Sequence, residues 1–475
     1  MNAIFREDLS RFDELLEQTA AYAADFLRRM HELPVSMEVP AIPLAGLPEK
    51  GMGGAAALEL FDNRFGSYLT ASAGPRYFGF VTGGVTPAAL AGDWLSSAID
   101  MNAADKSSLA FALEKETLQL LRQLFSLPDA FEGVFVTGAT MSNFTGLAAA
   151  RQWLGQQQGV NVAELGAGAL QNVKVLAATP HSSVSKALSM LGLGRSSLVL
   201  LPTLPGREAV DVKALERWIA DNPGTPFIYV ASAGTVNTVD FDDIAAIAAL
   251  KHKHPFWLHV DAAFGGFAAV SPRFRHWLNG WEQADSITID AHKWLNVPYD
   301  CAMLFSRHPL LQLEVFQNAG AAYLGDPAQN FNYINYAPEN SRRLRALPAW
   351  FSLRAYGAEG YRDVVEQNVK QAQRLGEALE KSGLFRLLAP VKMCVACFTF
   401  NMEERKLAGH IRVFLQALVK RGVVYITPTY YAGVPAMRAA LVNWRTTDKD
   451  TDLAIAELES AAASIQGLSA ILENN

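Results

Sequence analysis

Between residues 86 and 310 the sequence alternates between short β-rich runs and helical patterns, and this alternation restricts the fold more than any other feature. Helical patterns at 88–99, 108–126, 141–156, 183–192, 212–221 and 241–252 separate the runs. The runs read GVFVTG, VKVLAAT, SLVLLP, PFIYVAS, FWLHVDA, DSITID and AMLFS. Such alternation predicts right-handed βαβ units, and therefore an α/β fold whose mainly parallel sheet is covered by helices on both faces.

The flanking segments predict two further parts. Residues 8–30 have the apolar spacing of an amphipathic helix, and a connector rich in Pro and Gly runs from Pro34 to Gly54. The apolar face of that helix could cover a partner subunit or pack on its own domain. Beyond a loop-rich segment at 309–345, helical patterns cover 347–356 and 359–382.

The C-terminal part mixes the strand runs CVACFTF, GVVYITP and AMRAALVN with helical patterns, which indicates a smaller α+β domain. We therefore predict three parts. They are an N-terminal helical arm that mediates dimerisation (1–84), a large cofactor-binding domain (85–355) and a small C-terminal domain (356–475).

Composition excludes several classes of protein. The 475 residues are 50% hydrophobic and 19% charged, as in a globular chain, and the net charge of −6 offers no basic surplus for nucleic acid or anionic lipid. No apolar run approaches the roughly 18 residues of a membrane span, and the N-terminus lacks the apolar core of a signal peptide. Three cysteines are too few for a disulfide framework, so we expect a cytoplasmic protein without membrane or nucleic-acid partners.

Two of these cysteines form a CxxC pattern. Cys394 and Cys397 lie in a β-rich apolar run, where positions i and i+3 point to opposite faces of a strand. We interpret them as packed strand residues and predict no metal site.

Four local patterns follow the predicted strands in a fixed order. Thr137-Gly138-Ala139-Thr140 joins a strand to a helix, where small residues and the helix dipole favour an anion, although an ordinary turn with Thr140 as N-cap is the alternative. His181 comes directly after the run VKVLAAT and could equally be a helix cap. Asp261 ends the run FWLHVDA and could be a buried structural carboxylate. Lys293 follows DSITID and could be a solvated loop residue.

Taken together, these four patterns favour a site for pyridoxal 5'-phosphate. A lysine binds the cofactor aldehyde as a Schiff base, an aspartate keeps the pyridine nitrogen protonated, and a helix N-terminus holds the phosphate. A Rossmann-type nucleotide site is the remaining alternative, but no GxGxxG follows the first strand.

The sequence also resembles the group II pyridoxal-phosphate decarboxylases, a family that includes aromatic-L-amino-acid, histidine, tyrosine and glutamate decarboxylases. The spacing of 32 residues between Asp261 and Lys293 also suits the family. The matching stretches are PRYFGF (75–80), DWLSSA (93–98), TGATMSN (137–143), TPHSSV (179–184), LHVDAAFGG (258–266), DAHKWLNVPYDC (290–301), AYLG (322–325) and SRRLRALPAWFSLRAYG (341–357).

This resemblance implies a fold and a role for each residue. The fold is the aspartate aminotransferase-like fold type I, with a seven-stranded large domain, and the protein is a homodimer with active sites shared between subunits. Lys293 carries the Schiff base, Asp261 pairs with the pyridinium nitrogen, and Tyr323 donates a proton after CO2 leaves. The remaining implied contacts to the cofactor are His181 stacked on its ring, Ala263 on the other side, Ala139 and Thr140 at its phosphate, and His292 beside the Schiff base.

The implied reaction is the decarboxylation of an L-amino acid to an amine. An aldehyde-forming decarboxylation, a lyase reaction, a transamination and a non-catalytic cofactor-binding protein are the alternatives. Tyr323 argues against the aldehyde-forming branch, whose members have Phe at that position.

The substrate stays open at this stage. Tyr77, Phe78 and Phe80 could line an aromatic pocket, whereas an acidic substrate could use Asn102, Lys106 and the arginines at 342, 343 and 345. Asp105 also departs from the aromatic-rich segment of relatives with aromatic substrates. Asp290 stands where several family members have Asn near the phosphate, so this carboxylate must point away or be paired.

Overall fold

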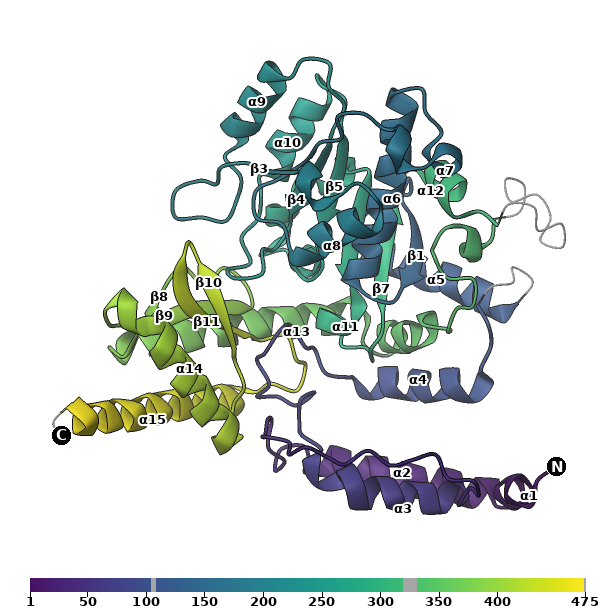
Figure 1. Ribbon diagram of the computed structural model, residues 1–475, viewed down its shortest axis with the longest axis vertical. Helices are drawn as coiled ribbons and strands as arrows, with labels where there is room; N and C mark the ends of the chain where they lie inside the picture. Colours follow the sequence, from purple (N-terminus) through teal and green to yellow (C-terminus); the bar gives the residue numbers. More distant parts are fainter. Residues whose placement is uncertain (104–107, 319–330, 474–475) are drawn as a thin grey trace.

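The computed structural model describes residues 1–103, 108–318 and 331–473, with side chains up to residue 465. It consists of a large α/β domain, a smaller α+β domain and an N-terminal arm (Figure 1). Among the described residues, no helix is both long and apolar enough to cross a membrane.

The large domain is built on a seven-stranded sheet with the order β1-β7-β6-β5-β4-β2-β3. Neighbouring strands from β6 through β5, β4 and β2 to β3 are parallel, whereas β7 is antiparallel to both β1 and β6. Every strand overlaps a predicted run, so the predicted α/β fold is confirmed. The strands are β1 (Glu132–Val136), β2 (Val175–Ala177), β3 (Leu198–Leu200), β4 (Ile228–Ser232), β5 (Trp257–Asp261), β6 (Ser286–Asp290) and β7 (Ala302–Ser306).

Both faces of this sheet are buried, because alternate residues of the strands enter different core clusters. Ile228 and Val230 pack with α6 and α8 on one face, whereas Tyr229 and Ala231 join the larger cluster on the other. This burial explains why the runs read as nearly continuous apolar segments. The helices of the domain are α4 (Pro87–Ile99), α5 (Leu109–Leu124), α6 (Ala139–Gln157), α7 (Val162–Leu165), α8 (Ser182–Met190), α9 (Val212–Asp221), α10 (Ile244–Lys251), α11 (Ala291–Trp294) and α12 (Pro309–Phe316).

The small domain packs two helices against a four-stranded antiparallel sheet with the order β10-β11-β9-β8. Its core is rich in phenylalanine, and Cys394 and Cys397 lie in different clusters, as expected for opposite faces of a strand. The elements are β8 (Phe385–Leu387), β9 (Val395–Phe400), α14 (Glu404–Arg421), β10 (Thr427–Tyr431), β11 (Val434–Ala440) and α15 (Asp448–Glu473).

The long helix α13 (Ala346–Lys381) connects the two domains. It is interrupted at Gly357, whose φ of 59° and ψ of −172° are not helical. The predicted helices at 347–356 and 359–382 are therefore two segments joined at this glycine, which lies next to the predicted domain boundary.

The arm differs from its prediction. The expected helix at 8–30 is divided at Arg11 into α1 (Ala3–Ser10) and α2 (Phe12–Arg29). A further helix, α3 (Gly54–Phe65), follows the connector and packs parallel to α2: Gly54 lies near Asp8 and Leu15, and Asp62 accepts a hydrogen bond from Tyr22 (Figure 1). Its small residues Gly54-Ala55-Ala56-Ala57 have little apolar periodicity, so no helix was expected there. Helix α12 is another difference, because 309–345 was predicted to be loop-rich.

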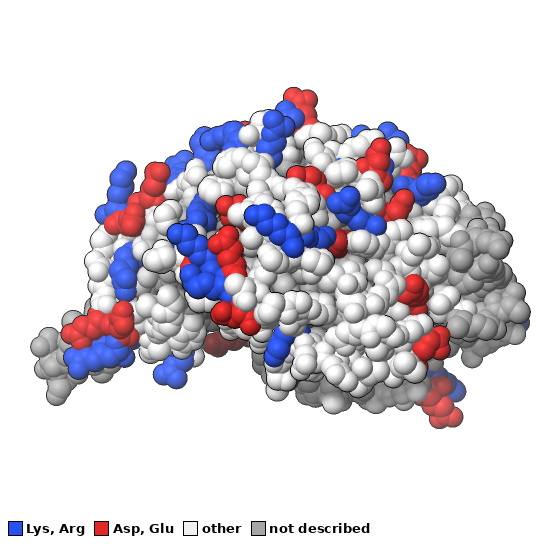
Figure 2. Space-filling view, turned by 90° about the horizontal axis from the view of Figure 1, so that it is seen from above, with Lys and Arg blue, Asp and Glu red and all other residues white. Residues whose placement is uncertain are grey.

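The surface carries mixed charge. On the face shown in Figure 2, basic and acidic side chains are interspersed, and no broad area has a single sign.

Candidate active site

The predicted site residues come together at the carboxyl ends of the central strands. Asp261 is the last residue of β5, Lys293 lies on the single turn α11 that follows β6, and His181 precedes α8 after β2. Parallel strands place their carboxyl ends at one edge of the sheet. Asn143 donates to both Asp261 and Ser183, and Ser183 Oγ lies 2.8 Å from His181 Nδ1, so Asp261 and His181 are close neighbours.

Lys293 is held in a confined position. Its Nζ lies 2.9 Å from Asp290 Oδ2 and 5.6 Å from the centre of the Phe264 ring. The backbone of Gly83 passes so close that a Cβ added there would lie 1.6 Å from the Lys293 carbonyl oxygen. Lys293 is therefore not a solvated loop lysine, and only 19% of its side chain is exposed.

Asp261 keeps part of its acceptor capacity free. Its Oδ2 accepts a hydrogen bond of 3.0 Å from Asn143 Nδ2, and among the described residues its Oδ1 accepts only the Ala263 N–H, at 3.3 Å. An ionised carboxylate can accept about four hydrogen bonds. This carboxylate can therefore accept a further N–H, as its predicted pairing with a protonated ring nitrogen requires.

Asn143 connects Asp261 to Ser183 and to the buried His259. Its Nδ2 also donates to Ser183 Oγ at 2.9 Å, and its Oδ1 lies 2.8 Å from His259 Nε2. Because an amide oxygen only accepts, His259 must carry its proton on Nε2. The fully buried His259 has its pKa lowered to about 4 by desolvation, so this ring is neutral. The sequence analysis gave Asn143 no role, although this residue lies in the matched stretch TGATMSN.

His181 is both a helix cap and a site residue. Its Nδ1 accepts the Ser183 N–H at 3.2 Å and lies 2.8 Å from Ser183 Oγ. The ring proton therefore lies on Nε2, which has no hydrogen-bond partner among the described residues. Burial lowers the pKa of His181, although the charge of Asp261 opposes this effect. The ring is therefore held neutral, with a fixed tautomer.

The predicted phosphate turn forms the start of α6. Gly138 is the N-cap, so the alternative that Thr140 caps the helix is wrong. The Thr140 N–H lies in the first turn, where no helical carbonyl can accept it, and its hydroxyl has no hydrogen-bond partner among the described residues. By contrast, the Ala139 N–H donates to Asp290 Oδ1 at 2.9 Å.

An aromatic cluster leads away from Lys293. The His292 ring packs 4.3 Å from Tyr299; burial chiefly raises the pKa of Tyr77, and Tyr425 and Tyr299 add to this effect. Tyr77 stacks on Tyr425 at 4.7 Å, and Phe80 lies 6.5 Å from the same ring. The expectation for Phe78 is wrong, because that side chain is buried in the core of the small domain.

The arginines considered for an acidic substrate are all paired. Arg342 forms a buried ion pair of 2.6 Å with Glu114, Arg343 pairs with Asp93 at 2.8 Å, and Arg345 pairs with Asp300 at 2.9 Å. Asn102 accepts the Arg342 N–H at 2.8 Å. Asp105, Lys106 and Tyr323 lie outside the described residues.

Sequence reasoning missed Arg438, which lies on β11 of the small domain. Its Nη1 donates to the Val236 carbonyl at 2.6 Å, and no carboxylate lies within ion-pairing distance among the described residues. The charge of Arg438 also lowers the pKa of His181, so it lies near the site. A single arginine in the apolar run AMRAALVN was the available signal, because burying such a charge is costly.

The residues on either side of Val236 make structural contacts. Thr235 and Asn237 both donate to the buried carboxylate of Glu208, at 2.5 and 2.9 Å. The backbone of Val236 is therefore the part of this loop that contacts Arg438.

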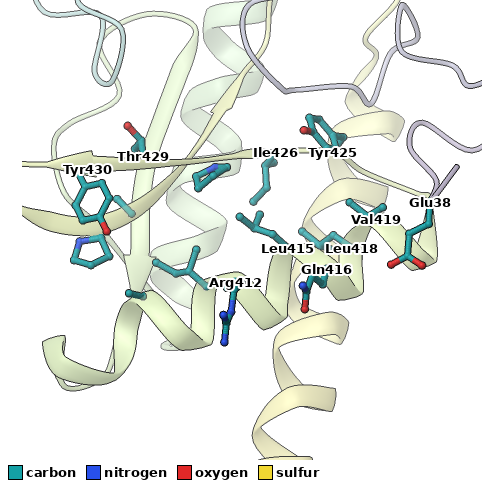
Figure 3. Close-up of a pocket in the computed structure, with 15 residues that line it drawn as sticks. Glu38, Arg412, Leu415, Gln416, Leu418, Val419, Tyr425, Ile426, Thr429 and Tyr430 are labelled. Atoms are coloured by element: carbon teal, nitrogen blue, oxygen red, sulfur yellow. The ribbon is translucent and has the colours of Figure 1, made fainter. Parts of the chain in front are cut away.

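A separate pocket lies between α14 and β10 (Figure 3). Arg412 and Gln416 extend from the helix, and Tyr425 and Tyr430 from the opposite segment. The lining contains none of Lys293, Asp261 and His181. This pocket is therefore distinct from the candidate active site, although the ring of Tyr425 contacts both.

The donor set fits pyridoxal 5'-phosphate. It provides an amine at Lys293, a carboxylate with free acceptor capacity at Asp261, a neutral imidazole at His181 and an open helix N-terminus at Thr140. These groups match the aldehyde, the ring nitrogen, the ring face and the phosphate. The Ala263 N–H donates to Asp261, and His292 Nε2 lies 3.5 Å from Asp290 Oδ1; their contacts to the cofactor stay predictions.

Comparison with known proteins gives a consistent result. The pyridoxal-dependent decarboxylase conserved domain matches residues 61–401. An aromatic-L-amino-acid decarboxylase of Bacillus atrophaeus is 26% identical over 444 residues, 90% of each chain. A phenylacetaldehyde synthase of Petunia hybrida is 24% identical over 451 residues, 88% of each chain. The crystal structure of Oryza sativa TDC with PLP and tryptamine superposes with a TM-score of 0.88 at 23% identity, covering 98% of this chain and 99% of the other.

Proposed function

The chain belongs to the pyridoxal-dependent decarboxylase family, and we propose that the amino acid it decarboxylates has an aromatic side chain. The protein is a pyridoxal-phosphate-dependent amino-acid decarboxylase. The observation that carries this conclusion at the level of residues is the convergence of Lys293, Asp261 and His181 at one edge of the sheet.

Each residue of the site contacts a different part of the cofactor in this proposal. When bound, pyridoxal phosphate supplies a conjugated ring that accepts the electrons of the breaking bond. Lys293 Nζ is the nucleophile for its aldehyde, and Asp261 holds a proton at the ring nitrogen. His181 and Ala263 confine the ring, and the first turn of α6 at Thr140 binds the phosphate.

An aromatic substrate is supported by what lines the site and by what is already paired. Tyr299 packs on His292, and the rings of Tyr77, Tyr425 and Phe80 form a cluster that extends from it. Aromatic pairs contribute about 0.5–1.5 kcal/mol beyond the area they bury. The arginines that could have bound a side-chain carboxylate already form ion pairs.

We assign the α-carboxylate of the substrate to Arg438. All amino-acid substrates carry this group, and Arg438 is a partly buried cation whose charge acts on His181 and which has no carboxylate partner among the described residues. A guanidinium and a carboxylate form strong, often bidentate hydrogen bonds. A substrate carboxylate would therefore complete the pairing of this charge.

A substrate survey tests the proposal. Purified protein reconstituted with pyridoxal 5'-phosphate would be supplied with aromatic amino acids, including DOPA and 5-hydroxytryptophan, and with glutamate, aspartate and cysteine sulfinate. We expect CO2 release and the matching amine from one or more aromatic substrates. Faster release from the acidic compounds would refute the aromatic assignment, and release of aldehyde in place of amine would indicate the chemistry of the Petunia relative.

We further propose a homodimer formed through the arm. None of α1, α2 and α3 contains a buried residue, and an apolar cleft of about 640 Å³ lies between α2, α3 and α4. Apolar surface of this extent is typical of a protein interface. The exposed apolar side chains of α1, α2, α3 and α4 are Phe5, Leu9, Phe12, Leu16, Leu60, Phe61, Phe65, Trp94, Leu95 and Ile99.

The oligomeric state can be tested with a matched pair of variants. Leu16 on α2 is 53% exposed and Leu310 on α12 is 69% exposed, so each is a surface leucine of the monomer. Leu16→Asp should shift the protein from dimer to monomer in sedimentation, whereas Leu310→Asp should not. A Leu16→Asp protein that remains dimeric and active would contradict an interface at the arm.

We also propose that the protein works in the reducing cytoplasm. Cys301, Cys394 and Cys397 are all buried free thiols, which is the state that such a compartment maintains. Cell fractionation with antibody detection tests this, and recovery from an oxidising compartment would contradict it.

A further inference from the structure

Asp290 contacts the two ends of the cofactor site at once. This carboxylate is 2% exposed, and its Oδ1 accepts the Ala139 N–H at 2.9 Å in the turn that is expected to bind the phosphate. Its Oδ2 lies 2.9 Å from Lys293 Nζ, and His292 Nε2 is 3.5 Å from Oδ1. The sequence analysis required this carboxylate to be paired or to point away, and the structure shows it paired.

The contact with Ala139 places a negative charge in an anion site. The first turn of a helix attracts an anion through its free N–H groups and its dipole. Asp290 already uses one of these N–H groups, and its charge repels any second anion bound by the remaining ones. A phosphate of about −2 charge at pH 7 is therefore bound less tightly in this turn than in the same turn without the carboxylate.

The contact with Lys293 does not remove this effect. The ammonium now balances the charge of Asp290, but the same nitrogen is the atom that must react with the cofactor aldehyde. In that step Nζ would form a double bond to the aldehyde carbon, the aldehyde oxygen would leave as water, and at most one proton would remain on the nitrogen. The nitrogen would then have at most one N–H to donate to Asp290, so the bond to the cofactor would weaken the ion pair.

We infer that Asp290 weakens the binding of the cofactor phosphate. It also favours the singly charged form of the phosphate, with one proton shared between the phosphate and the Asp290 carboxylate. Like charges forced together retain a proton that each would lose alone. The second pKa of a phosphate monoester is about 6, so a modest rise is enough to keep this proton at neutral pH. This inference rests on the cofactor and is independent of the substrate proposed above.

The chain offers a matched control at the other end of the same strand. Asp285 precedes β6 and is also buried; it accepts the Leu258 N–H at 2.7 Å and contacts Lys251 at 2.6 Å and His308 at 2.7 Å. Each aspartate thus contacts one backbone N–H, one lysine and one histidine. Asp285→Asn reproduces the general cost of losing a buried charge pair, away from the phosphate turn.

The test compares pyridoxal 5'-phosphate with pyridoxal, which lacks the phosphate. The dissociation constants of both compounds would be measured by absorbance titration for the wild type, Asp290→Asn and Asp285→Asn. The asparagine keeps an oxygen for the Ala139 N–H and removes only the charge. The ratio of the two constants should favour the phosphorylated compound at least tenfold more in Asp290→Asn than in the wild type, and change less than twofold in Asp285→Asn. An unchanged ratio in Asp290→Asn would overturn the inference.

A second measurement needs no variant that might fail to fold. The ³¹P NMR shift of the cofactor bound to wild-type protein reports the charge of its phosphate. We expect a singly charged or titrating phosphate between pH 6 and 8, and a doubly charged one in Asp290→Asn. A doubly charged, pH-independent signal in the wild type would disprove the role of Asp290 while leaving the decarboxylase intact. A wild type that binds neither compound would overturn both.

Discussion

Replacing Asn143 with alanine should show whether Asn143 supports Asp261 in the reaction, in addition to stabilising the fold. The change removes a hydrogen bond of 3.0 Å to the Asp261 carboxylate, one of 2.9 Å to Ser183 and one of 2.8 Å to His259. All three partners are at least partly buried, so water cannot easily replace the amide. The variant therefore leaves the buried imidazole N–H with only a long contact of 3.5 Å to Thr288 Oγ1, and Asp261 without the donor Asn143.

The magnitude follows from these contacts. A hydrogen bond to a charged group contributes about 1.5–3 kcal/mol, and a buried polar group left without a partner costs about 1–3 kcal/mol. Because the three bonds share one side chain, their effects are not additive, and we expect the free energy of unfolding to fall by about 4 kcal/mol. If about half of this loss is expressed at Asp261 in the reaction, turnover should fall about thirtyfold, since 1.4 kcal/mol corresponds to tenfold.

The assay needs a control that loses as many buried hydrogen bonds elsewhere. Asn443 is also buried; its Nδ2 donates to the carbonyls of Ala73 and Gly74, and its Oδ1 accepts the Arg445 N–H. Urea unfolding should show comparable losses for Asn143→Ala and Asn443→Ala. Only Asn143→Ala should lose turnover and cofactor affinity together. If its turnover stays within threefold of that of Asn443→Ala, Asn143 does not support Asp261.

Four further predictions concern single residues. Burial lowers the pKa of His259 from 6.5 to about 4, so between these pH values the unfolded chain binds a proton that the folded protein excludes. As the pH drops from 7 to 4, the free energy of unfolding of the wild type should therefore fall by about 3 kcal/mol more than that of His259→Gln, measured by urea unfolding. Asp261→Ala should lower turnover at least a hundredfold and weaken cofactor retention in steady-state assays and dialysis, because a buried ion pair broken on one side costs about 3–5 kcal/mol. Arg438→Gln should raise KM for the amino acid at least tenfold without changing the inhibition constant of the product amine, which has no carboxylate. Tyr323→Phe should reduce amine formation by about 10²–10⁴, measured by mass spectrometry, if that residue is the proton donor; an unchanged rate would assign the proton elsewhere.

The central sheet and the reactive residues could be predicted because their signals are local. Asp261 and Lys293 each come within a few residues of an apolar run that can only be a buried strand, and parallel strands bring such ends together without further information. The helix α3 gave no such signal. Its run of alanines and its few apolar side chains are used at the surface of the arm, where no core imposes a period.

Phe78 shows why the lining of the pocket could not be predicted. Tyr77 and Phe78 are adjacent in sequence, yet one stacks on Tyr425 and the other enters the core of the small domain. Their segment is extended, with Phe78 N–H donating to the Tyr425 carbonyl and Phe78 O accepting from the Ala440 N–H, so successive side chains point in opposite directions. Which of the two faces the site depends on where the small domain docks.

The position of Arg438 at the site also depends on where the small domain docks, and this position has a consequence for the reaction. It belongs to the small domain and contacts the large domain at the Val236 carbonyl, whereas Lys293 and Asp261 belong to the large domain. A substrate held by Arg438 would therefore bridge the two domains, and its carboxylate would be held by a group that is fixed independently of the cofactor. Truncating Arg438 should then affect a compound that carries a carboxylate and spare one that does not, whatever its side chain. Substrate preference and carboxylate binding are thus separate properties of this site. The aromatic residues around Tyr425 lie outside the strands, whereas Arg438 lies on β11.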